Sequence, residues 1–342
     1  MTATFSSTHT LDVPNGFQEA ACPKCGSWDR HIVATGRDYL HGLPGHYSAC
    51  ECHGCGLWFL SPRPTPEQLA SLYPDEYAPH AESEPLQFGP EIASYLAGTL
   101  GYSHLAVATE PRRSWRASLD RARLRWKVGV NLIPRWVPSG SVLEIGAASG
   151  TRLAMLRDLG WMDLHGIELV PAAAERARSR GAKVLCGSVE ETLASYADRS
   201  FDVVITSMVI EHLSNPFDTM QKIAKKLRPG GQLLFSTVTR DSLDARMFGS
   251  YWGGFDFPRH LVFFRDRDIA DMISPGFRML EKFHHGAPQD FLRSASWRRP
   301  EGRWADRLVL SIRDGLLQYR LGLVLAWAGL TCRVSYRCER KP

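Results

Sequence analysis

The sequence lacks a strong excess of charge of either sign. Its 342 residues hold 41 Lys plus Arg against 36 Asp plus Glu, which gives a formal net charge of +5. So slight an excess is not the electrostatic footprint of a nucleic-acid-binding protein, and nucleic acid is therefore disfavoured as a partner. Apolar residues make up 44% of the chain and charged residues 23%, a balance that excludes long disordered segments.

Uninterrupted apolar runs are also missing. The first residues, MTATFSSTHTLDV, contain neither the basic segment nor the apolar core of a secretory signal. The longest apolar stretch, 308–330, is interrupted by Arg313, Asp314 and Arg320, whose charges are costly at the centre of a bilayer. We therefore expect no transmembrane segment and a cytoplasmic location, where the eight cysteines are thiols or metal ligands and not disulfides.

Four of the cysteines form two C-x-x-C pairs, CPKC and CHGC, each followed by glycine. Two residues between thiolates allow a tight turn to aim both sulfurs at one ion, and two such turns complete a tetrahedral shell. We expect zinc as the metal. Because four thiolates leave no open position for substrate, the ion is predicted to be structural rather than catalytic. The predicted ligands are Cys22, Cys25, Cys52 and Cys55.

The other cysteines are predicted to have no role in metal binding. Cys50 is close enough to be a substitute ligand, but its spacing to Cys52 is too short for the usual knuckle, so we interpret it as a bystander. Cys186, Cys332 and Cys338 lie in apolar or alternating runs and are predicted to be core residues.

The segment after the second pair is interpreted as a linker. Pro62, Pro64 and Pro66 break regular structure before a short helix that reaches Tyr73 and Tyr77. The following stretch, 90–136, has a weakly amphipathic helical pattern in which Arg and Trp recur.

From Ser141 onward, short apolar runs alternate with helical stretches, which is typical of a doubly wound α/β fold with a parallel sheet. The predicted strands are SVLEIG, DLHGIE, AKVLC, FDVVITS and GQLLFSTV, and the predicted helices are 151–159, 172–180, 189–196 and 216–227. A final alternating stretch at Val334 and Tyr336 fits a closing antiparallel strand.

The turn after the first predicted strand reads E-x-G-x-x-x-G, with Glu144 in the strand and glycines at 146 and 150. A backbone without bulky side chains allows a ligand to lie against the turn. A carboxylate at this position would repel a pyrophosphate but attract the ammonium group of a methionine moiety. Glu168, 24 residues further on, is placed to accept hydrogen bonds from ribose hydroxyls. The pattern favours S-adenosylmethionine over NAD.

The ordered motifs VLEIGAASG, GIE, GSVEE, FDVVITSMVIEHL and LRPGG resemble the class I S-adenosylmethionine-dependent methyltransferases. They resemble most the bacterial branch with an N-terminal zinc ribbon. The resemblance implies a Rossmann-like seven-stranded sheet with helical additions. It also implies cofactor-binding roles for Glu144, Gly146, Ala147 and Gly150 (methionine part), Glu168 and Leu169 (ribose), Ser188 and Val189 (adenine) and Met208 (floor). One departure is Ala148, where the family usually has the middle glycine of its loop.

On this basis the chain is divided into four parts. A zinc-ribbon domain is expected over 1–62 and a linker with a helical region over 63–136. The S-adenosylmethionine-binding core is expected over 137–284, followed by a C-terminal helical insertion and closing strand over 285–342.

A second motif, YWGGFDFPRHLVFF over 251–264, resembles the substrate loop of sugar C-methyltransferases, which ends in Glu-His before an aromatic run. The matching pair here is Arg259 and His260, so the histidine is kept and the glutamate is not. The resemblance implies substrate contacts from Tyr251, Trp252, Phe255 and Arg259. His260 is the candidate general base, because the ordinary pKa of histidine suits proton abstraction near neutrality. The alternative is a histidine that orders the loop.

Glu211 and His212 form a second acid and imidazole pair just after the fourth predicted strand, at the edge of the sheet where substrates bind. They are candidate catalytic residues that could reach the acceptor. A divalent ion is conceivable there, but no further carboxylate completes an oxygen-rich shell. A polar pair that orders the loop is the favoured alternative.

The C-terminal apolar helices have several interpretations. They could form a lid, a homodimer face or a contact with a lipid-linked acceptor, and internal packing against the Arg/Trp-rich region before Trp136 is favoured.

The leading hypothesis is methyl transfer to oxygen or carbon of a small-molecule acceptor: a sugar nucleotide, a polysaccharide precursor or a natural product. RNA methylation is the second, motivated by the zinc ribbon and the arginines over 112–125, although the chain contains no NPPY-like tetrad and no Pro-Cys nucleophile. A third hypothesis is a non-catalytic S-adenosylmethionine-binding module, motivated by Ala148 and Arg259.

Overall fold

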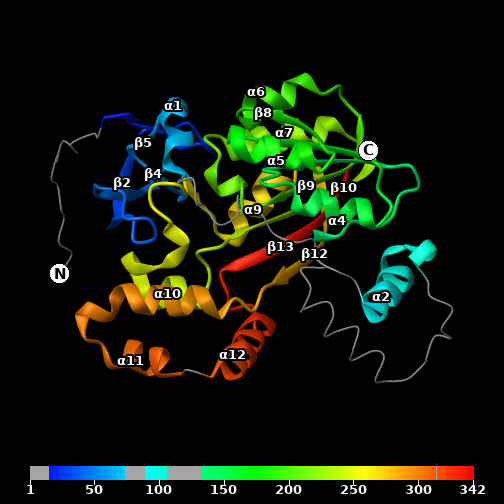
Figure 1. Ribbon diagram of the computed structural model, residues 1–342. Coiled ribbons are helices and arrows are strands. Elements are labelled where there is room, and N and C mark those ends of the chain that lie inside the picture. The colour runs from blue at the N-terminus through cyan, green and yellow to red at the C-terminus, as the bar shows by residue number, and fades with distance from the viewer. Residues whose placement is uncertain (1–14, 74–88, 106–131, 313) are drawn as a thin grey trace.

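A computed structural model describes residues 15–73, 89–105, 132–312 and 314–342 of the chain (Figure 1). Tyr77 and the arginine-rich stretch 112–125, which the sequence analysis singled out, lie outside the described residues. The main body is a seven-stranded sheet with helices on both faces, and a smaller sheet lies at one side of it.

The large sheet has the strand order β12-β13-β10-β9-β6-β7-β8. Strand β13 is antiparallel to both of its neighbours, whereas the pairs from β10 to β8 are all parallel. The predicted α/β class and the closing antiparallel strand are therefore confirmed. The strands are β6 (Ser141–Ile145), β7 (Asp163–Glu168), β8 (Lys183–Cys186), β9 (Phe201–Ser207), β10 (Leu227–Val238), β12 (Phe277–His284) and β13 (Arg333–Arg340).

The central strands form because both of their faces are covered. All five residues of β6 are buried, as expected for a parallel strand between two helical layers. Alternate residues belong to two apolar clusters: Leu143 and Ile145 pack on one face, and Val142 packs on the other. The edge strand β12 was not predicted, because charged and exposed side chains interrupt its apolar pattern.

The helices between these strands begin at clear start signals. Prolines occupy the first turn of α5 and α7, and the Asn215 side chain caps α7 by accepting from the amide of Asp218 at 3.1 Å. The helices of the core are α4 (Thr151–Asp158), α5 (Pro171–Ser179), α6 (Val189–Thr192), α7 (Pro216–Lys226), α8 (Leu243–Phe248) and α9 (Asp266–Ile273).

The smaller sheet has the order β11-β4-β3-β2, and its edge strand comes from the core. Strand β11 (Val262–Phe263) pairs antiparallel with β4 (Trp58–Leu60). The other strands are β2 (Arg30–Gly36) and β3 (Tyr47–Cys52), and a separate pair is formed by β1 (Phe17–Gln18) and β5 (Arg63–Pro64). A short helix α1 (Pro66–Leu69) follows, and α2 (Pro90–Leu100) lies in the described part of the linker.

One apolar cluster joins the two sheets, because it contains Phe59 and Cys52 together with Leu143 and Phe263. The N-terminal region is thus packed against the core through a shared apolar cluster. Strand β5 lies just beyond residue 62, where the ribbon was predicted to end. The four-part division of the chain otherwise stays a prediction.

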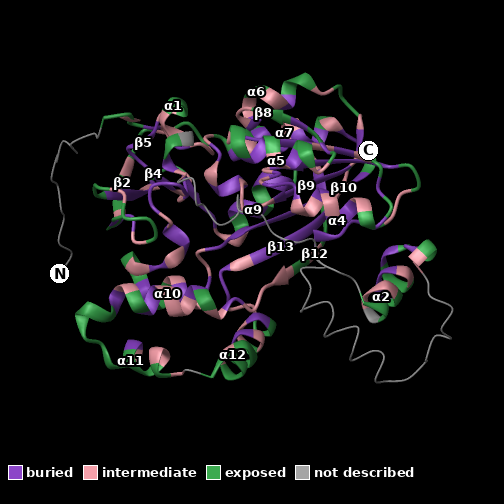
Figure 2. Cartoon of the chain, in the orientation of Figure 1, coloured by how far each residue is buried: buried purple, intermediate pink, exposed green. Residues whose placement is uncertain are grey.

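Between β12 and β13 the chain forms α10 (Pro288–Arg298), α11 (Trp304–Ser311) and α12 (Gly315–Trp327). These helices lie along the lower edge in Figure 1, and much of α11 and α12 is exposed (Figure 2). No helix in the described residues combines the length and the apolar character needed to span a membrane.

Candidate active site

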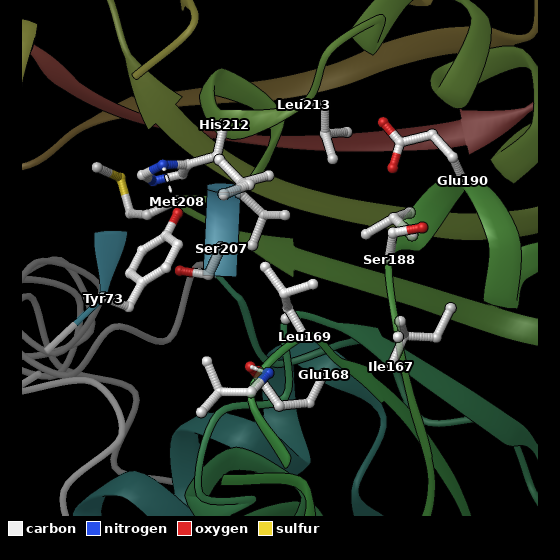
Figure 3. A pocket seen from close by; sticks show the side chains of 16 residues that line it. Tyr73, Ile167, Glu168, Leu169, Ser188, Glu190, Ser207, Met208, His212 and Leu213 are labelled. Carbon is white, nitrogen blue, oxygen red and sulfur yellow. Dashed lines mark hydrogen bonds between the residues drawn. The ribbon is translucent and has the colours of Figure 1, made fainter. Parts of the chain in front are cut away.

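A cavity opens at the carboxyl ends of β6, β7 and β9, the position where open α/β sheets bind ligands (Figure 3). Six of the nine residues predicted to bind the cofactor line it: Gly146, Glu168, Leu169, Ser188, Val189 and Met208. The other three, Glu144, Ala147 and Gly150, lie behind the lining. Leu69 and Tyr73, which follow the N-terminal sheet, close the cavity from the opposite side.

The turn after β6 adopts a left-handed backbone at three positions. Gly146 has φ +74°, Gly150 has φ +77°, and Ala148 has φ +48°. A side chain at Gly146 would meet Val209 Cγ2 at 2.4 Å, and one at Gly150 would meet the backbone of Ala177 at 2.8 Å. Both glycines are therefore required by space as well as by backbone conformation. Ala148 adopts the conformation that the family's usual glycine favours, at a steric cost.

Glu168 holds this turn. Its two carboxylate oxygens accept from the amides of Ala148 at 2.8 Å and Val170 at 2.9 Å. The carboxylate lines the cavity while it is anchored by these donors, so its orientation is set before any ligand enters (Figure 3).

Glu144 is buried behind the turn. One oxygen accepts from Arg152 Nη1 at 2.6 Å, and Oε2 has no hydrogen-bond partner among the described residues. Burial raises the pKa of Glu144 to about 7, although Arg152 acts in the opposite direction. A buried carboxylate oxygen without a donor suits a cationic group, such as the ammonium that the sequence analysis assigned to it.

His212 and Tyr73 meet at the far end of the cavity. The Tyr73 hydroxyl lies 3.1 Å from His212 Nδ1, and both side chains line the cavity. The same nitrogen lies 3.0 Å from the carbonyl oxygen of Arg259, to which it can donate. Burial, and then the neighbouring His260, lower the pKa of His212 to about 3, so its ring is neutral at pH 7.

His260, the predicted base, lies behind His212 and is 5% exposed. The two rings are perpendicular, with centroids 4.6 Å apart. His260 Nδ1 donates to the carbonyl oxygen of Gly254 at 2.8 Å, and Nε2 lies 3.9 Å from Asp256 Oδ2. His260 contacts the cavity through His212 and does not line it.

Glu211 completes this cluster and is fully buried. Its Oε2 accepts from the Thr237 hydroxyl at 2.9 Å, and Oε1 has no partner among the described residues. Burial raises the pKa of Glu211, against the opposing effect of His260. One ligand-type atom from each of Glu211, His212 and His260 lies within 4.8 Å of the others. The structure thus brings all three predicted catalytic residues together.

Tyr73 was not predicted as a site residue. The sequence placed it only at the end of a short helix after the ribbon. Nothing in the local pattern indicates that this helix folds back over the cavity, since that depends on how the N-terminal sheet docks.

The four residues predicted to contact substrate do not line this cavity. Arg259 is fully buried, and its guanidinium donates to both oxygens of Asp38, each at 2.9 Å, and to Asp256 at 2.7 Å. Burial alone would raise the pKa of Asp38, but the hydrogen bonds from Arg259 outweigh it and lower that pKa. Arg259 therefore ties the N-terminal region to the loop over 251–264.

The aromatic residues of the loop pack among themselves. The Trp252 indole donates to Asp244 at 3.0 Å, and Phe255 stacks on Phe257 with centroids 4.8 Å apart. Trp252 and Phe255 line a second, smaller cavity, and Tyr251 packs against Tyr39 at 5.7 Å. In this conformation the four side chains shape the loop and do not reach the space beside Met208.

The four predicted metal ligands converge at the other end of the N-terminal sheet. Cys22 Sγ lies 3.5 Å from Cys55 Sγ, and Cys25 Sγ lies 3.5 Å from Cys52 Sγ. A tetrahedral ion with sulfur bonds of about 2.3 Å requires neighbouring sulfurs at about 3.8 Å. All four cysteines are free thiols, so the donor set fits zinc.

The remaining cysteines agree with their predicted roles except at one position. Cys50 lies outside the cluster and contacts the Ser61 carbonyl at 3.6 Å, and Cys332 and Cys338 are buried. Cys186 is exposed, so its prediction as a core residue was wrong, because β8 is an edge strand of the large sheet.

Comparisons with known proteins agree with this geometry. Residues 113–280 match the family model described as a methyltransferase domain. The O-methyltransferase cnsE of Penicillium expansum is 28% identical over 147 residues, 41% of this chain and 52% of that protein. A malonyl-acyl-carrier protein O-methyltransferase of Herminiimonas arsenicoxydans is 31% identical over 149 residues, 42% of this chain and 55% of that protein. The chain spans about half the length of these two relatives.

Among solved structures, the geranyl diphosphate C-methyltransferase of Streptomyces coelicolor A3(2) is similar with a TM-score of 0.48 and 13% identity, over 81% of this chain and 99% of that one. The fold is assigned from the strand order of the large sheet. By its strand order, its glycine turn and the match over 113–280, the chain belongs to the class I S-adenosylmethionine-dependent methyltransferases.

Proposed function

We propose that this protein transfers the methyl group of S-adenosylmethionine to an oxygen or carbon atom of a small-molecule acceptor. The observation that carries the proposal is one cavity with two chemically different ends. Gly146, Glu168 and Met208 line the end that fits the cofactor, and His212 with Tyr73 lines the other. Relatives named as O-methyltransferases support the reaction class.

S-adenosylmethionine supplies an electrophilic methyl group when bound. Gly146 leaves room for it against the turn, and Glu144 offers an unpartnered carboxylate oxygen to its ammonium group. Glu168 faces the ribose position, and Ser188 with Val189 borders the adenine position. The chain thus positions the donor, and positioning is the main requirement of an in-line displacement.

Proton removal from the acceptor is assigned to the histidine pair. His260 is the predicted base, and His212 is the histidine that lines the cavity. In the proposed arrangement His212 touches the acceptor, and His260 supports it from behind at 4.6 Å between ring centroids. The neutral His212 ring can accept a hydrogen bond from the acceptor group, although burial keeps its basicity low, and the Tyr73 hydroxyl, 3.1 Å from Nδ1, can orient that group.

We also propose that Cys22, Cys25, Cys52 and Cys55 hold a structural zinc ion, which the distances between their sulfurs support. A filled four-thiolate shell has no open position for chemistry. Its role would be to hold the sheet that carries β4 and β11.

Two experiments test the proposed reaction. Calorimetry should detect binding of S-adenosylmethionine to the purified protein, and absence of binding would remove the catalytic assignment. Incubation with cofactor labelled in the methyl group and an extract of the host should then label a small molecule. Label recovered in RNA, together with steeply salt-dependent RNA binding, would favour RNA methylation instead.

A further inference from the structure

Helices α11 and α12 present apolar side chains to the outside in an unusual arrangement. Seven large residues on them are between 42% and 82% exposed: Trp304, Leu308, Leu316, Leu317, Leu321, Val324 and Trp327. We call these residues the apolar face. Ordinary surface helices turn such residues toward the core. Exposed apolar residues that gather on two consecutive helices, both packed against α10, indicate an interaction site.

The side of α12 that packs on the protein carries its smallest residues. Gly322 and Ala326 are buried, and Gly322 packs against Pro288 and Gly286 so closely that an added side-chain carbon would lie 3.1 Å from Pro288 Cδ. The helix is thus attached through small residues, while Leu316, Leu317 and Trp327 are exposed. Leu321 and Val324 are also exposed and line an open apolar cavity between α12 and α10. In water this arrangement gives α11 and α12 little stabilisation from the hydrophobic effect, because their larger side chains stay exposed.

The charges around the apolar face are positive. Arg299, Arg307 and Arg320 are exposed and form no ion pair within the described part of the chain. The nearby acids are already engaged, since Asp306 is buried against Arg298 at 2.6 Å and Asp314 caps α12 through the amides of Leu316 and Leu317. Arginine beside exposed leucine and tryptophan is the composition of elements that lie at anionic membrane surfaces.

The position of the two tryptophans agrees with such a surface. Trp304 begins α11 and Trp327 ends α12, with 77% and 82% of their surfaces exposed. Indoles favour the boundary between headgroups and acyl chains. A helix of 13 residues is about 20 Å long and cannot cross a bilayer core of about 30 Å. It can lie flat in the interface.

We propose that the apolar face docks this protein on an anionic lipid surface, with α11 and α12 lying in the headgroup region. This inference is independent of the methyl-transfer proposal. It differs from self-association, because an isologous dimer through this face would bring the same unpaired arginines of two copies together. Figure 2 shows exposed residues on both helices, along one edge of the molecule.

Sedimentation with vesicles tests the proposal on the full chain. The protein should pellet with vesicles of phosphatidylcholine and phosphatidylglycerol, and much less with phosphatidylcholine alone. Changing Trp304→Gln and Trp327→Gln together should weaken binding about tenfold or more, because two interfacial indoles are lost. The matched control is Trp28→Gln with Met162→Gln, which changes two residues that are 61% and 77% exposed elsewhere.

A second variant addresses charge. Arg299→Glu with Arg307→Glu should remove the preference for anionic vesicles while leaving S-adenosylmethionine binding unchanged in calorimetry. The proposal would be overturned if the protein did not bind anionic vesicles. It would also be overturned if the Trp304/Trp327 variant bound them as well as the wild type and the Trp28/Met162 control do. A dimer in analytical ultracentrifugation that the Trp304/Trp327 variant alone dissociates would overturn it too, since the face would then be covered by a second copy.

Discussion

At the scale of single residues, two of the five described non-glycine residues with left-handed backbone border the candidate site. Ala148 and Met208 have φ values of +48° and +55°, and both lie in segments that border the cavity. Such conformations cost about 1–2 kcal/mol each and persist where the surrounding structure holds them. For Ala148 the holding group is Glu168, which accepts from its amide at 2.8 Å.

Substitution at the two small residues of the turn should have very different effects on cofactor binding. Gly146→Ala places a carbon 2.4 Å from Val209 Cγ2 at φ +74°, so it should abolish measurable S-adenosylmethionine binding in calorimetry. Ala148→Gly is the matched control. It relieves strain of about 1 kcal/mol but loses about 0.4–1 kcal/mol through the freer unfolded chain, so stability and affinity should be nearly unchanged. Tight binding by the Gly146 variant would contradict the proposed cofactor position.

Glu144 should make cofactor affinity depend on pH. Its pKa of about 7 means that the carboxyl is largely protonated at pH 6 and ionised at pH 8. The ammonium of the ligand favours the ionised form, so affinity should rise with pH by at most about tenfold per unit. The raised pKa also means that the free protein loses stability as pH rises from 4.5 toward 7. Glu144→Gln should flatten both profiles, and an unchanged affinity profile would count against the contact.

The histidine pair can be separated by kinetics once an acceptor is identified. His212→Asn should lower kcat about a hundredfold or more with unchanged cofactor affinity, because it removes the imidazole that contacts the acceptor in the cavity. His260→Asn should lower kcat less, since it acts from behind. The exposed His46→Asn serves as the control. Full turnover in both site variants would rule out general-base catalysis by this pair.

At the scale of elements, the four-cysteine cluster and the candidate site are connected by two strand pairings. Cys52 ends β3, β3 pairs with β4, and β4 pairs with β11, which begins two residues after His260. The Leu261 amide in turn donates to the Glu211 carbonyl at 2.7 Å. A disturbance of the cysteine cluster therefore has a short route through backbone hydrogen bonds to the histidines.

Removing the metal should therefore affect both stability and turnover. Elemental analysis should find one zinc per chain, and chelation or Cys22→Ser should lower the melting temperature and reduce turnover. Cys50→Ala, at a buried cysteine outside the cluster, should retain the metal. A chain without metal whose melting is insensitive to chelation would contradict the zinc proposal. If the wild type holds a second equivalent of metal and Glu211→Gln loses it, that second ion would be assigned to Glu211, His212 and His260.

At the scale of the whole molecule, the N-terminal region and the core are joined by buried charge as well as by strand pairing. Arg259 reaches from the loop over 251–264 to Asp38, between β2 and β3, and all three charged groups of the Asp38–Arg259–Asp256 cluster are largely buried. Lys24 adds a further ion pair to Asp268 at 3.1 Å. The two regions should consequently unfold as one unit.

Removal of Arg259 tests this coupling. Arg259→Met leaves two buried carboxylates unpaired, which should cost about 3–5 kcal/mol in urea unfolding near neutral pH. Arg278→Met, which breaks an exposed pair with Glu339, is the control and should cost little. In the wild type the pKa of Asp38 is lowered from its ordinary value of 3.8. The ion pair with Arg259 therefore stabilises the folded protein at pH values above 3.8, and this stabilisation is lost as the pH falls toward the lowered pKa. The deficit of the variant should therefore shrink in acid, and a deficit that grows would refute the assignment.

The order of strands and helices from β6 to β10 and the cysteine and glycine motifs could be predicted from the sequence, because each depends on residues close together in the chain. Both faces of β6 are buried in any parallel arrangement, and a C-x-x-C turn points two sulfurs the same way wherever it lies. The cofactor end of the cavity follows from the same local pattern, since the carboxyl ends of parallel strands meet at one edge.

The acceptor end depends on contacts between residues that are distant in sequence, and only the folded structure reveals it. Tyr73 reaches His212 across 139 positions, and Arg259 meets Asp38 across 221, so no local pattern indicates either contact. As a result of these contacts, His260 lies behind His212. Arg259 forms ion pairs with two aspartates and does not line the cavity. The docking of the N-terminal sheet on the core, through long-range packing and a shared strand, decides which predicted side chains face the ligand.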